Sequence, residues 1–211
     1  MNNLKDFYEE YWHEGEPQPL ADPLSAVRQR ILWNRVTAAR LHRGAFLDCG
    51  SGHGDLVADA TRRGLLATGL EISEAAVALA RSRHPDCSFV CHSLEALPWP
   101  VEQQAFDVVS SFEVIEHLIR PRRLLEGAFR ALRNGGYVAI TTPYHGRVKD
   151  LALAIVGFER HFAVEGPHIR FFTDASLRRL ALDVGFRNVE FFHYGRVPPL
   201  WSGVFMWARK P

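Results

Sequence analysis

Apolar and polar residues follow two alternating patterns along this chain: short runs that are apolar almost throughout, and longer stretches with a helical period. The apolar runs predict strands, and they cover Ala45–Cys49, Leu66–Leu70, Ser88–Cys91, Phe106–Phe112, Tyr137–Thr142, Phe186–His193 and Gly203–Ala208. Strands of a parallel sheet are buried on both faces, which is why such runs lack regular alternation. The pattern therefore predicts a mostly parallel sheet.

Helices are predicted between the strands, where apolar residues recur every three or four positions. The first, Leu24–Leu41, shows this spacing at Val27, Ile31 and Val36. The others are expected at Asp55–Arg63, Ser73–Arg83, Pro121–Arg133 and Thr173–Val184, with Ser73 as an N-cap and glycines at positions 64, 135, 136 and 185 as stops. Alternation of strands and helices predicts a doubly wound α/β fold. The last two strands have no helix between them, which predicts an antiparallel hairpin at the sheet edge.

The domain organisation follows from length and from the proline positions. A chain of 211 residues suits one large domain, which we expect at 24–211. Pro17, Pro19 and Pro23 separate an N-terminal arm, residues 1–23, whose Tyr8, Tyr11 and Trp12 either dock it on the domain or form a lid. The pattern loosens in an insert at about 146–170. Its apolar, basic-flanked segment 148–162 either covers a pocket or contacts a membrane surface.

Charge and cysteine content exclude some classes of protein. The formal net charge of +1 makes a dedicated nucleic-acid binder unlikely. The three cysteines show no disulfide-type spacing, the N-terminus does not resemble a signal peptide, and no apolar stretch is long enough for a membrane span. We therefore expect a cytoplasmic protein.

A glycine-rich loop, D-x-G-x-G-x-G from Asp48 to Gly54, joins the first strand to a helix. Glycines let the backbone approach a ligand closely, and Glu71 at the end of the second strand is suited to bind a ribose diol. The alternative is a tight turn without a ligand. The carboxylate of Asp48 would repel the pyrophosphate of NAD but attract a cation such as an ammonium or sulfonium group.

This loop, together with Glu71, resembles the cofactor signature of class I S-adenosylmethionine-dependent methyltransferases, and the resemblance runs from about Ala45 to Ala208. It implies a seven-stranded sheet with an antiparallel last strand. It also implies S-adenosylmethionine as cofactor, with the methionyl end near the loop, the ribose on Glu71 and the adenine against Ser93 and Leu94. The family commonly has Asp at the position of Ser93. The cofactor-binding residues expected from the resemblance are Asp48, Gly50, Ser51, Gly52, Glu71, Ile72, Ser93, Leu94 and Phe112.

A second group of polar residues, E-x-x-E-H at Glu113, Glu116 and His117, follows the fourth strand. Side chains three and four positions apart share one face of a helical turn, and carboxylates with an imidazole can hold a divalent cation. Alternatively, Glu113 contacts the cofactor and the other two side chains cap the turn or face solvent. The segment resembles ubiquinone-biosynthesis O-methyltransferases and small-RNA 2′-O-methyltransferases. That resemblance implies a Mg²⁺ or Mn²⁺ site at Glu113, Glu116, His117 and His168.

The expected activity is O-methylation of a small hydroxylated substrate, similar to a catechol or quinone precursor. A base assists such a transfer, and the candidates are His117 and His145, because histidine titrates near neutral pH. Within enzymes, the alternatives are methylation of an RNA 3′-terminal ribose, and methylation of a sugar or natural product. Two further alternatives are a cofactor-binding regulatory domain without activity and, least favoured, an NAD-dependent dehydrogenase.

Overall fold

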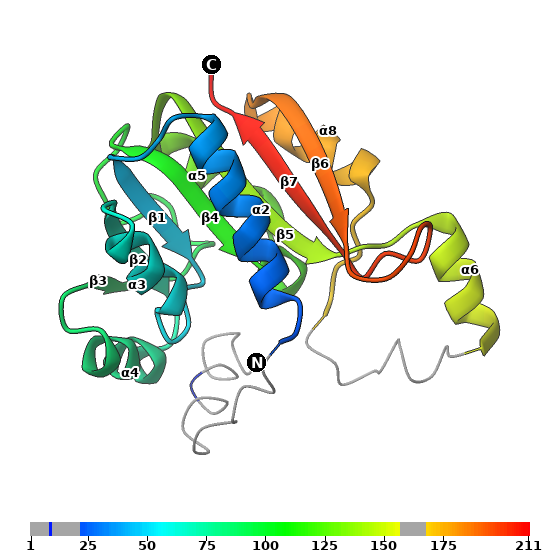
Figure 1. Ribbon diagram of the computed structural model, residues 1–211, viewed down its shortest axis with the longest axis horizontal. Helices are drawn as coiled ribbons and strands as arrows, with labels where there is room; N and C mark the ends of the chain where they lie inside the picture. The colour runs from blue at the N-terminus through cyan, green and yellow to red at the C-terminus, as the bar shows by residue number, and fades with distance from the viewer. Residues whose placement is uncertain (1–8, 10–21, 157–167) are drawn as a thin grey trace.

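A seven-stranded sheet forms the centre of the molecule in the computed structural model, which describes residues 9, 22–156 and 168–211 (Figure 1). The strands are β1 (Ala45–Cys49), β2 (Leu66–Glu71), β3 (Ser88–Cys91), β4 (Phe106–Phe112), β5 (Leu132–Pro143), β6 (Arg187–Tyr194) and β7 (Gly203–Arg209). Their spatial order is β3-β2-β1-β4-β5-β7-β6. The predicted doubly wound α/β fold is confirmed.

The predicted hairpin at the end of the chain is confirmed as well. β7 pairs antiparallel with both β5 and β6, whereas the pairs among β1 to β5 are all parallel. β7 therefore lies between β5 and β6 inside the sheet, and β6 forms the edge. The parallel strands all end at the same side of the sheet, which is where open α/β sheets bind ligands.

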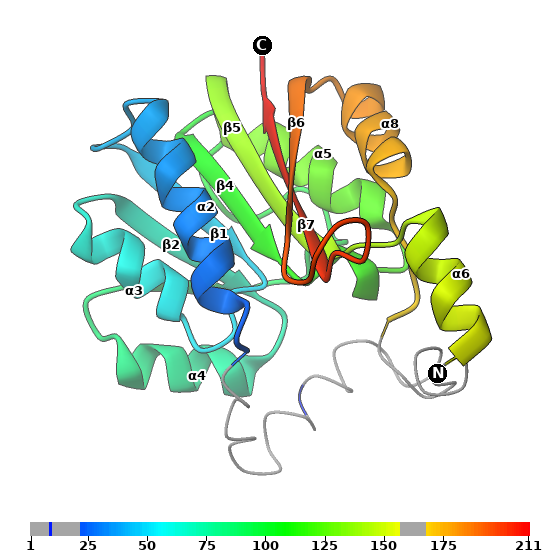
Figure 2. The same cartoon turned by 45° about the vertical axis from the view of Figure 1, so that its right-hand side comes forward.

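Helices cover both faces of the sheet (Figures 1 and 2). They are α2 (Ser25–Ala38), α3 (Asp55–Arg62), α4 (Glu74–Arg83), α5 (Pro121–Ala131), α6 (Arg147–Val156) and α8 (Asp174–Val184), with the short 3-10 helix η1 (Ile115–His117) after β4. Both views show α6 apart from the sheet, at the opposite end of the molecule from α3 and α4.

Neighbouring residues of the central strands are buried on opposite faces. Phe46 packs with α2 and α3 in one apolar cluster, and Leu47 packs with α5 and α8 in another. Both side chains are completely buried. This explains why the strand is apolar throughout, as expected for a parallel sheet with helices on both sides.

The predicted start of α4 is correct, whereas the predicted end of α5 is not. The Ser73 hydroxyl accepts the backbone N–H of Ala76 at 3.1 Å, so the predicted N-cap of α4 is confirmed. The predicted end of α5 at Arg133 is wrong, because the helix ends at Ala131. The Asn-Gly-Gly sequence that follows belongs to β5, where the N–H of Gly135 donates to the Lys210 carbonyl at 3.0 Å.

The arm and part of the insert lie outside the described residues. This applies to Tyr8, Tyr11 and Trp12 and to 157–167, so the predicted lid and the predicted domain limits stay predictions. Within the described ranges, none of the helices has the length and apolar character that a membrane crossing requires.

Candidate cofactor and substrate site

The glycine loop after β1 is held in a conformation that side chains rarely adopt. Gly50 and Gly52 have φ angles of +79° and +48°, and the N–H of Gly50 donates to the Leu70 carbonyl at 2.7 Å. A Cβ atom on Gly50 would lie 2.5 Å from Cγ2 of Val114. Glycine is therefore required here both by the backbone angle and by the close approach of the segment after β4.

A cavity of about 160 Å³ lies beside this loop at the ends of the parallel strands. Its walls come from the loop, from β2, from the turn after β3 and from the segment after β4. Most of the predicted cofactor-binding residues line it, namely Gly50, Gly52, Glu71, Ile72, Ser93, Leu94 and Phe112. Val114 and Leu118 complete the apolar part of the lining.

The other two predicted residues, Asp48 and Ser51, line a second cavity beside the loop, with a volume of about 230 Å³. Arg28 and Gln29 of α2 line the same cavity. The two cavities share Gly50, Gly52 and Phe112, so they adjoin at the loop, and we refer to them together as the cleft.

Asp48 is buried in the floor of this cleft. Its carboxylate accepts the hydroxyl of Ser110 at 2.7 Å. Burial raises the pKa of Asp48 to about 7; the negative charge of Glu71 contributes in the same direction, and the Ser110 hydrogen bond opposes it. A cationic group in the cleft would favour the ionised form of Asp48.

Glu71, at the end of β2, is fixed by three backbone N–H groups. Oε2 accepts Gly52 at 3.0 Å, and Oε1 accepts Ile72 at 2.7 Å and Ser73 at 3.1 Å. Burial raises the pKa of Glu71, while these hydrogen bonds lower it. The carboxylate thus has a defined orientation at the cavity wall, as a residue that binds a ribose diol requires.

The turn after β3 lies beside Glu71, because Cys91 pairs with Glu71 in the sheet and the N–H of His92 donates to the Glu71 carbonyl at 2.7 Å. Leu94 is buried, and its carbonyl accepts the indole N–H of Trp99 at 3.2 Å. The Ser93 hydroxyl accepts the N–H of Glu95 at 3.3 Å, so it stabilises the turn as well as lining the cavity. This geometry fits an adenine ring against Leu94, which stays a prediction.

Glu113 lines the same cavity as His117 but does not belong to the group of ligand atoms formed by Glu116, His117 and His168. Its Oε1 accepts the hydroxyls of Thr141 at 2.8 Å and Tyr194 at 3.1 Å, and Arg28 of α2 approaches it to 4.0 Å. The backbone of Glu113 has φ +54°, which turns the chain away from β4. Its role as a metal ligand stays a prediction. The hydrogen bonds to Thr141 and Tyr194 do not favour that role, because they occupy Oε1.

Sequence reasoning missed Arg28 and Tyr194, although one signal was present. Arg28 is four positions before Leu32, so it lies on the buried face of α2, and it is only 8% exposed. A charged residue on the apolar face of a helix is rarely buried without a partner. Tyr194, at the end of β6, has no comparable signal because it follows an ordinary apolar run.

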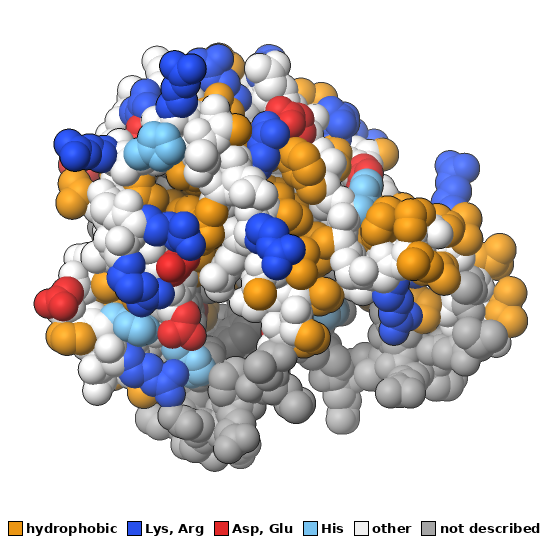
Figure 3. All heavy atoms as spheres, in the orientation of Figure 1, with side chains coloured by type: hydrophobic (Ala, Val, Ile, Leu, Met, Phe, Trp, Pro, Cys, Tyr) orange, Lys and Arg blue, Asp and Glu red, His pale blue; other side chains and the backbone are white. Residues whose placement is uncertain are grey.

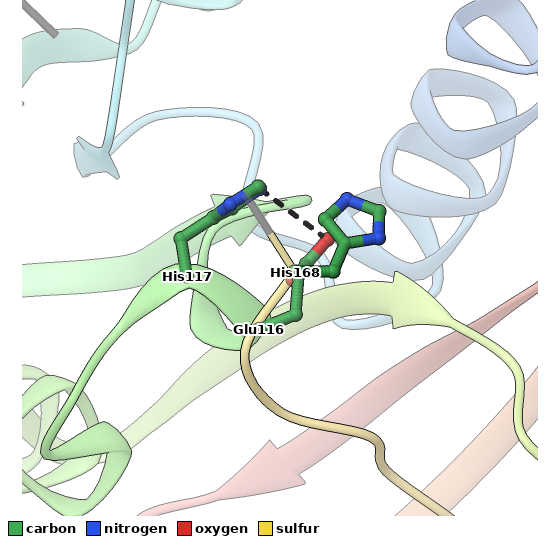
Figure 4. Close-up of side chains that lie close together, drawn as sticks. All are labelled: Glu116, His117 and His168. Carbon is green, nitrogen blue, oxygen red and sulfur yellow. Dashed lines mark ion pairs between the residues drawn. The ribbon is translucent and has the colours of Figure 1, made fainter. Parts of the chain in front are cut away.

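Glu116, His117 and His168 do come together, as Figure 4 shows. One ligand atom from each lies within 4.8 Å of the others. The backbone explains the juxtaposition, because the carbonyl of Glu116 accepts the N–H groups of both Ile169 at 3.1 Å and Arg170 at 3.0 Å. These bonds hold the chain after position 167 against η1, so that His168 lies next to His117.

The carboxylate of Glu116 is buried, with the residue 1% exposed. Neither of its oxygens has a hydrogen bond among the described residues, and Oε1 lies 3.9 Å from Nε2 of His117, an ion pair when that imidazole is protonated. Burial raises the pKa of Glu116 to about 8, and the charge of Glu113 contributes in the same direction. Burial lowers the pKa of His168, and the charge of Glu113 opposes that shift. A carboxylate together with two imidazoles is a donor set that fits a divalent cation.

His145, the second candidate base, follows β5 and does not line either cavity. Its Nδ1 lies 3.1 Å from Oδ1 of Asp150 in the first turn of α6, and its ring packs edge-on against Phe171 at 4.8 Å. The predicted His117 does line the main cavity. Of the two, His117 is therefore the better placed for a bound substrate.

Comparisons with known proteins agree with this geometry. Residues 18–191 match the family described as "Methyltransferase domain". The chain is 38% identical over 122 residues to a probable S-adenosylmethionine-dependent methyltransferase of Mycolicibacterium smegmatis, a match that covers 55% of this chain and 44% of that protein. It therefore spans less than half the length of this relative. It is 25% identical over 205 residues to the ubiquinone biosynthesis O-methyltransferase of Coxiella burnetii, covering 92% of this chain and 85% of that protein.

Solved structures show the same fold. Magnesium protoporphyrin IX methyltransferase from Synechocystis, which contains S-adenosylhomocysteine, superposes with a TM-score of 0.69 and 15% identity over 99% of this chain and 88% of that one. None of these three proteins is named for an RNA substrate, so the resemblance to small-RNA methyltransferases stays a prediction. The chain belongs to the methyltransferase-domain family and is a class I S-adenosylmethionine-dependent methyltransferase.

Proposed function

We propose that this enzyme transfers a methyl group to a hydroxyl oxygen of a small substrate with vicinal hydroxyl groups. The observation that carries the proposal is the buried carboxylate of Glu116, which has no hydrogen bond among the described residues and lies 3.9 Å from Nε2 of His117, with His168 beside it. The similarity to ubiquinone biosynthesis O-methyltransferases supports the same substrate class.

The residues that would hold a divalent cation are Glu116, His117 and His168. A buried carboxylate without hydrogen bonds is costly, and a bound cation would offset that cost. A Mg²⁺ or Mn²⁺ held there would supply Lewis acidity, which lowers the pKa of a substrate hydroxyl that binds it.

The other residues bind and orient the reactants. Asp48 and the loop residues Gly50 and Gly52 face the positively charged methionyl part of the cofactor, and Glu71 binds the ribose hydroxyls. Arg28, which lines the cavity on the methionyl side, is placed to pair with the α-carboxylate of that group. Holding the sulfonium methyl in line with the acceptor oxygen supplies much of the rate.

The substrate proton needs an acceptor. His117 lines the cavity and can accept it at Nε2 when it does not ligate a cation. His145 is an alternative acceptor, also at Nε2, because Asp150 is close to Nδ1. An acceptor role for His145 requires a substrate large enough to reach the end of β5.

We further propose that α6 brings the enzyme into peripheral contact with a lipid surface. Val148, Leu151 and Ile155 recur at helical spacing and are 56%, 64% and 74% exposed. Figure 3 shows hydrophobic side chains gathered over the part of the molecule where α6 lies. Arg147 provides an exposed positive charge beside them. Replacing Leu151 and Ile155 with glutamate should abolish sedimentation with vesicles containing anionic lipid; unchanged sedimentation would contradict the proposal.

The experiment that tests the proposed reaction is a labelled-methyl transfer assay with 3,4-dihydroxybenzoate and added Mn²⁺. We expect transfer that falls at least tenfold on chelation with EDTA and in Glu116→Gln, while the exposed control Glu102→Gln keeps full activity. Transfer that survives thorough chelation would overturn the cation proposal. If the enzyme bound S-adenosylmethionine but methylated amines and no hydroxylated compound, O-methylation itself would be wrong.

A further inference from the structure

A residue of the N-terminal arm makes a specific contact with the cofactor side of the sheet. The carboxylate of Glu9 binds the N-terminus of α4, more than sixty positions away in the chain. Its Oε1 accepts the N–H of Glu74 at 2.6 Å, and its Oε2 accepts the N–H of Ala75 at 3.2 Å and the hydroxyl of Ser73 at 3.0 Å.

These contacts complete the capping of α4. The first N–H groups of a helix have no partner within the helix, and they carry the positive end of its dipole. The Ser73 hydroxyl accepts only the N–H of Ala76. Glu9 supplies acceptors for the two N–H groups that Ser73 leaves open, and its negative charge complements the dipole.

The same contacts continue into the cofactor cleft. Ser73 is completely buried, and its N–H donates to Oε1 of Glu71 at 3.1 Å. The other carboxylate oxygen of Glu71 accepts the N–H of Gly52 in the glycine loop at 3.0 Å. One continuous chain of hydrogen bonds therefore connects Glu9, Ser73, Glu71 and Gly52.

Electrostatics agree with this connection. Burial is the largest effect on the pKa of Glu71 and raises it, and the three backbone hydrogen bonds lower it. The negative charge of Glu9 makes a smaller contribution that also raises this pKa. The two carboxylates are thus close enough to interact, and the turn between them is held from both sides. Ile72, at the centre of that turn, lines the cavity directly.

We propose that Glu9 is a positioning residue for the cofactor. By fixing Ser73 and the first turn of α4, it holds the Glu71 carboxylate in the orientation that binds the ribose. The inference rests on the proposed ribose-binding role of Glu71, and it gives the N-terminal arm a part in cofactor affinity that does not depend on the methyl acceptor.

The test is isothermal titration of the full-length protein with S-adenosylhomocysteine. We expect the dissociation constant of Glu9→Ala to rise about tenfold, which corresponds to about 1.4 kcal/mol. Glu9→Gln, which keeps one neutral acceptor, should lie between Glu9→Ala and wild type. Glu102→Gln, which removes the same charge at an exposed position, should bind like wild type.

A double-mutant cycle separates positioning from simple anchoring of the arm. Because Glu9 acts through Ser73, Ser73→Ala should weaken binding less in the Glu9→Ala background than in wild type. A dissociation constant for Glu9→Ala within twofold of wild type would overturn the proposal, even if the melting temperature of the free protein fell. Fully additive effects would also overturn it. If Glu71→Ala itself kept wild-type affinity, the ribose assignment would be the part that failed.

Discussion

Replacing Asp48 with asparagine removes an ionisable group from the floor of the cofactor cleft while keeping nearly the same shape. Asp48 is 4% exposed, and its one hydrogen bond comes from the hydroxyl of Ser110. An asparagine oxygen can accept that same bond. The substitution also introduces a buried amide NH₂, whose effect does not depend on pH, so the pH dependence of the difference isolates the charge.

The expected size of the effect follows from the pKa, which burial raises from 3.8 to about 7. The folded state binds the Asp48 proton more tightly than the unfolded state does. Protonated Asp48 therefore favours the folded state, and that advantage disappears when the proton is lost. Its contribution to stability is fully present below pH 3.8 and is lost as the pH rises towards 7. At about 1.4 kcal/mol per pH unit, the stability of Asp48→Asn relative to wild type should increase by roughly 2–3 kcal/mol between pH 5 and pH 8.

Urea unfolding of both proteins at pH 5, 6, 7 and 8 measures this difference directly. Glu116 also titrates in this range, but it is present in both proteins, so its contribution cancels to first order. A difference between the two proteins that does not change with pH would refute the reasoning. In wild type, S-adenosylhomocysteine should bind more tightly as the pH rises from 6 to 8, because its ammonium group favours ionised Asp48; Asp48→Asn should lose that dependence.

Two further substitutions test the loop and the core. Gly50→Ala combines a left-handed backbone angle with a contact to Val114, so it should weaken S-adenosylhomocysteine binding at least tenfold in a titration, and adding Val114→Ala should restore part of the loss. Full affinity in Gly50→Ala would contradict the close approach. Lys210→Met should lower the free energy of unfolding by about 2 kcal/mol in urea, because the buried ammonium group donates to the carbonyls of Phe129 and Leu132 at 2.7 Å. No change in stability would show that those carbonyls need no donor.

Features set by local pattern could be predicted from the sequence. The order of strands and helices, the Ser73 cap and the antiparallel end of the sheet all follow from periodicity, capping chemistry and connection length. The residues predicted to bind the cofactor also line adjoining cavities, because a glycine loop and the ends of parallel strands must meet at one edge of the sheet. The end of α5 could not be predicted, since Gly135 pairs with Lys210 from the far end of the chain rather than stopping the helix.

Features set by contacts between distant segments could not be predicted from local patterns. The orientation of Glu113 depends on Tyr194 and Arg28, which come from opposite ends of the domain, so the sequence suggested four metal ligands where the structure groups three. The position of His168 beside His117 depends on backbone hydrogen bonds to the Glu116 carbonyl, and it was expected only from the family resemblance.

A crystal structure with S-adenosylhomocysteine tests the central claim most directly. The account predicts the ribose hydroxyls on the Glu71 carboxylate, the sulfur beside the Gly50–Gly52 loop and the amino-acid end on the Arg28 side of the cleft. A nucleoside bound outside this cleft, or bound with Glu71 making no contact to the ribose, would contradict it.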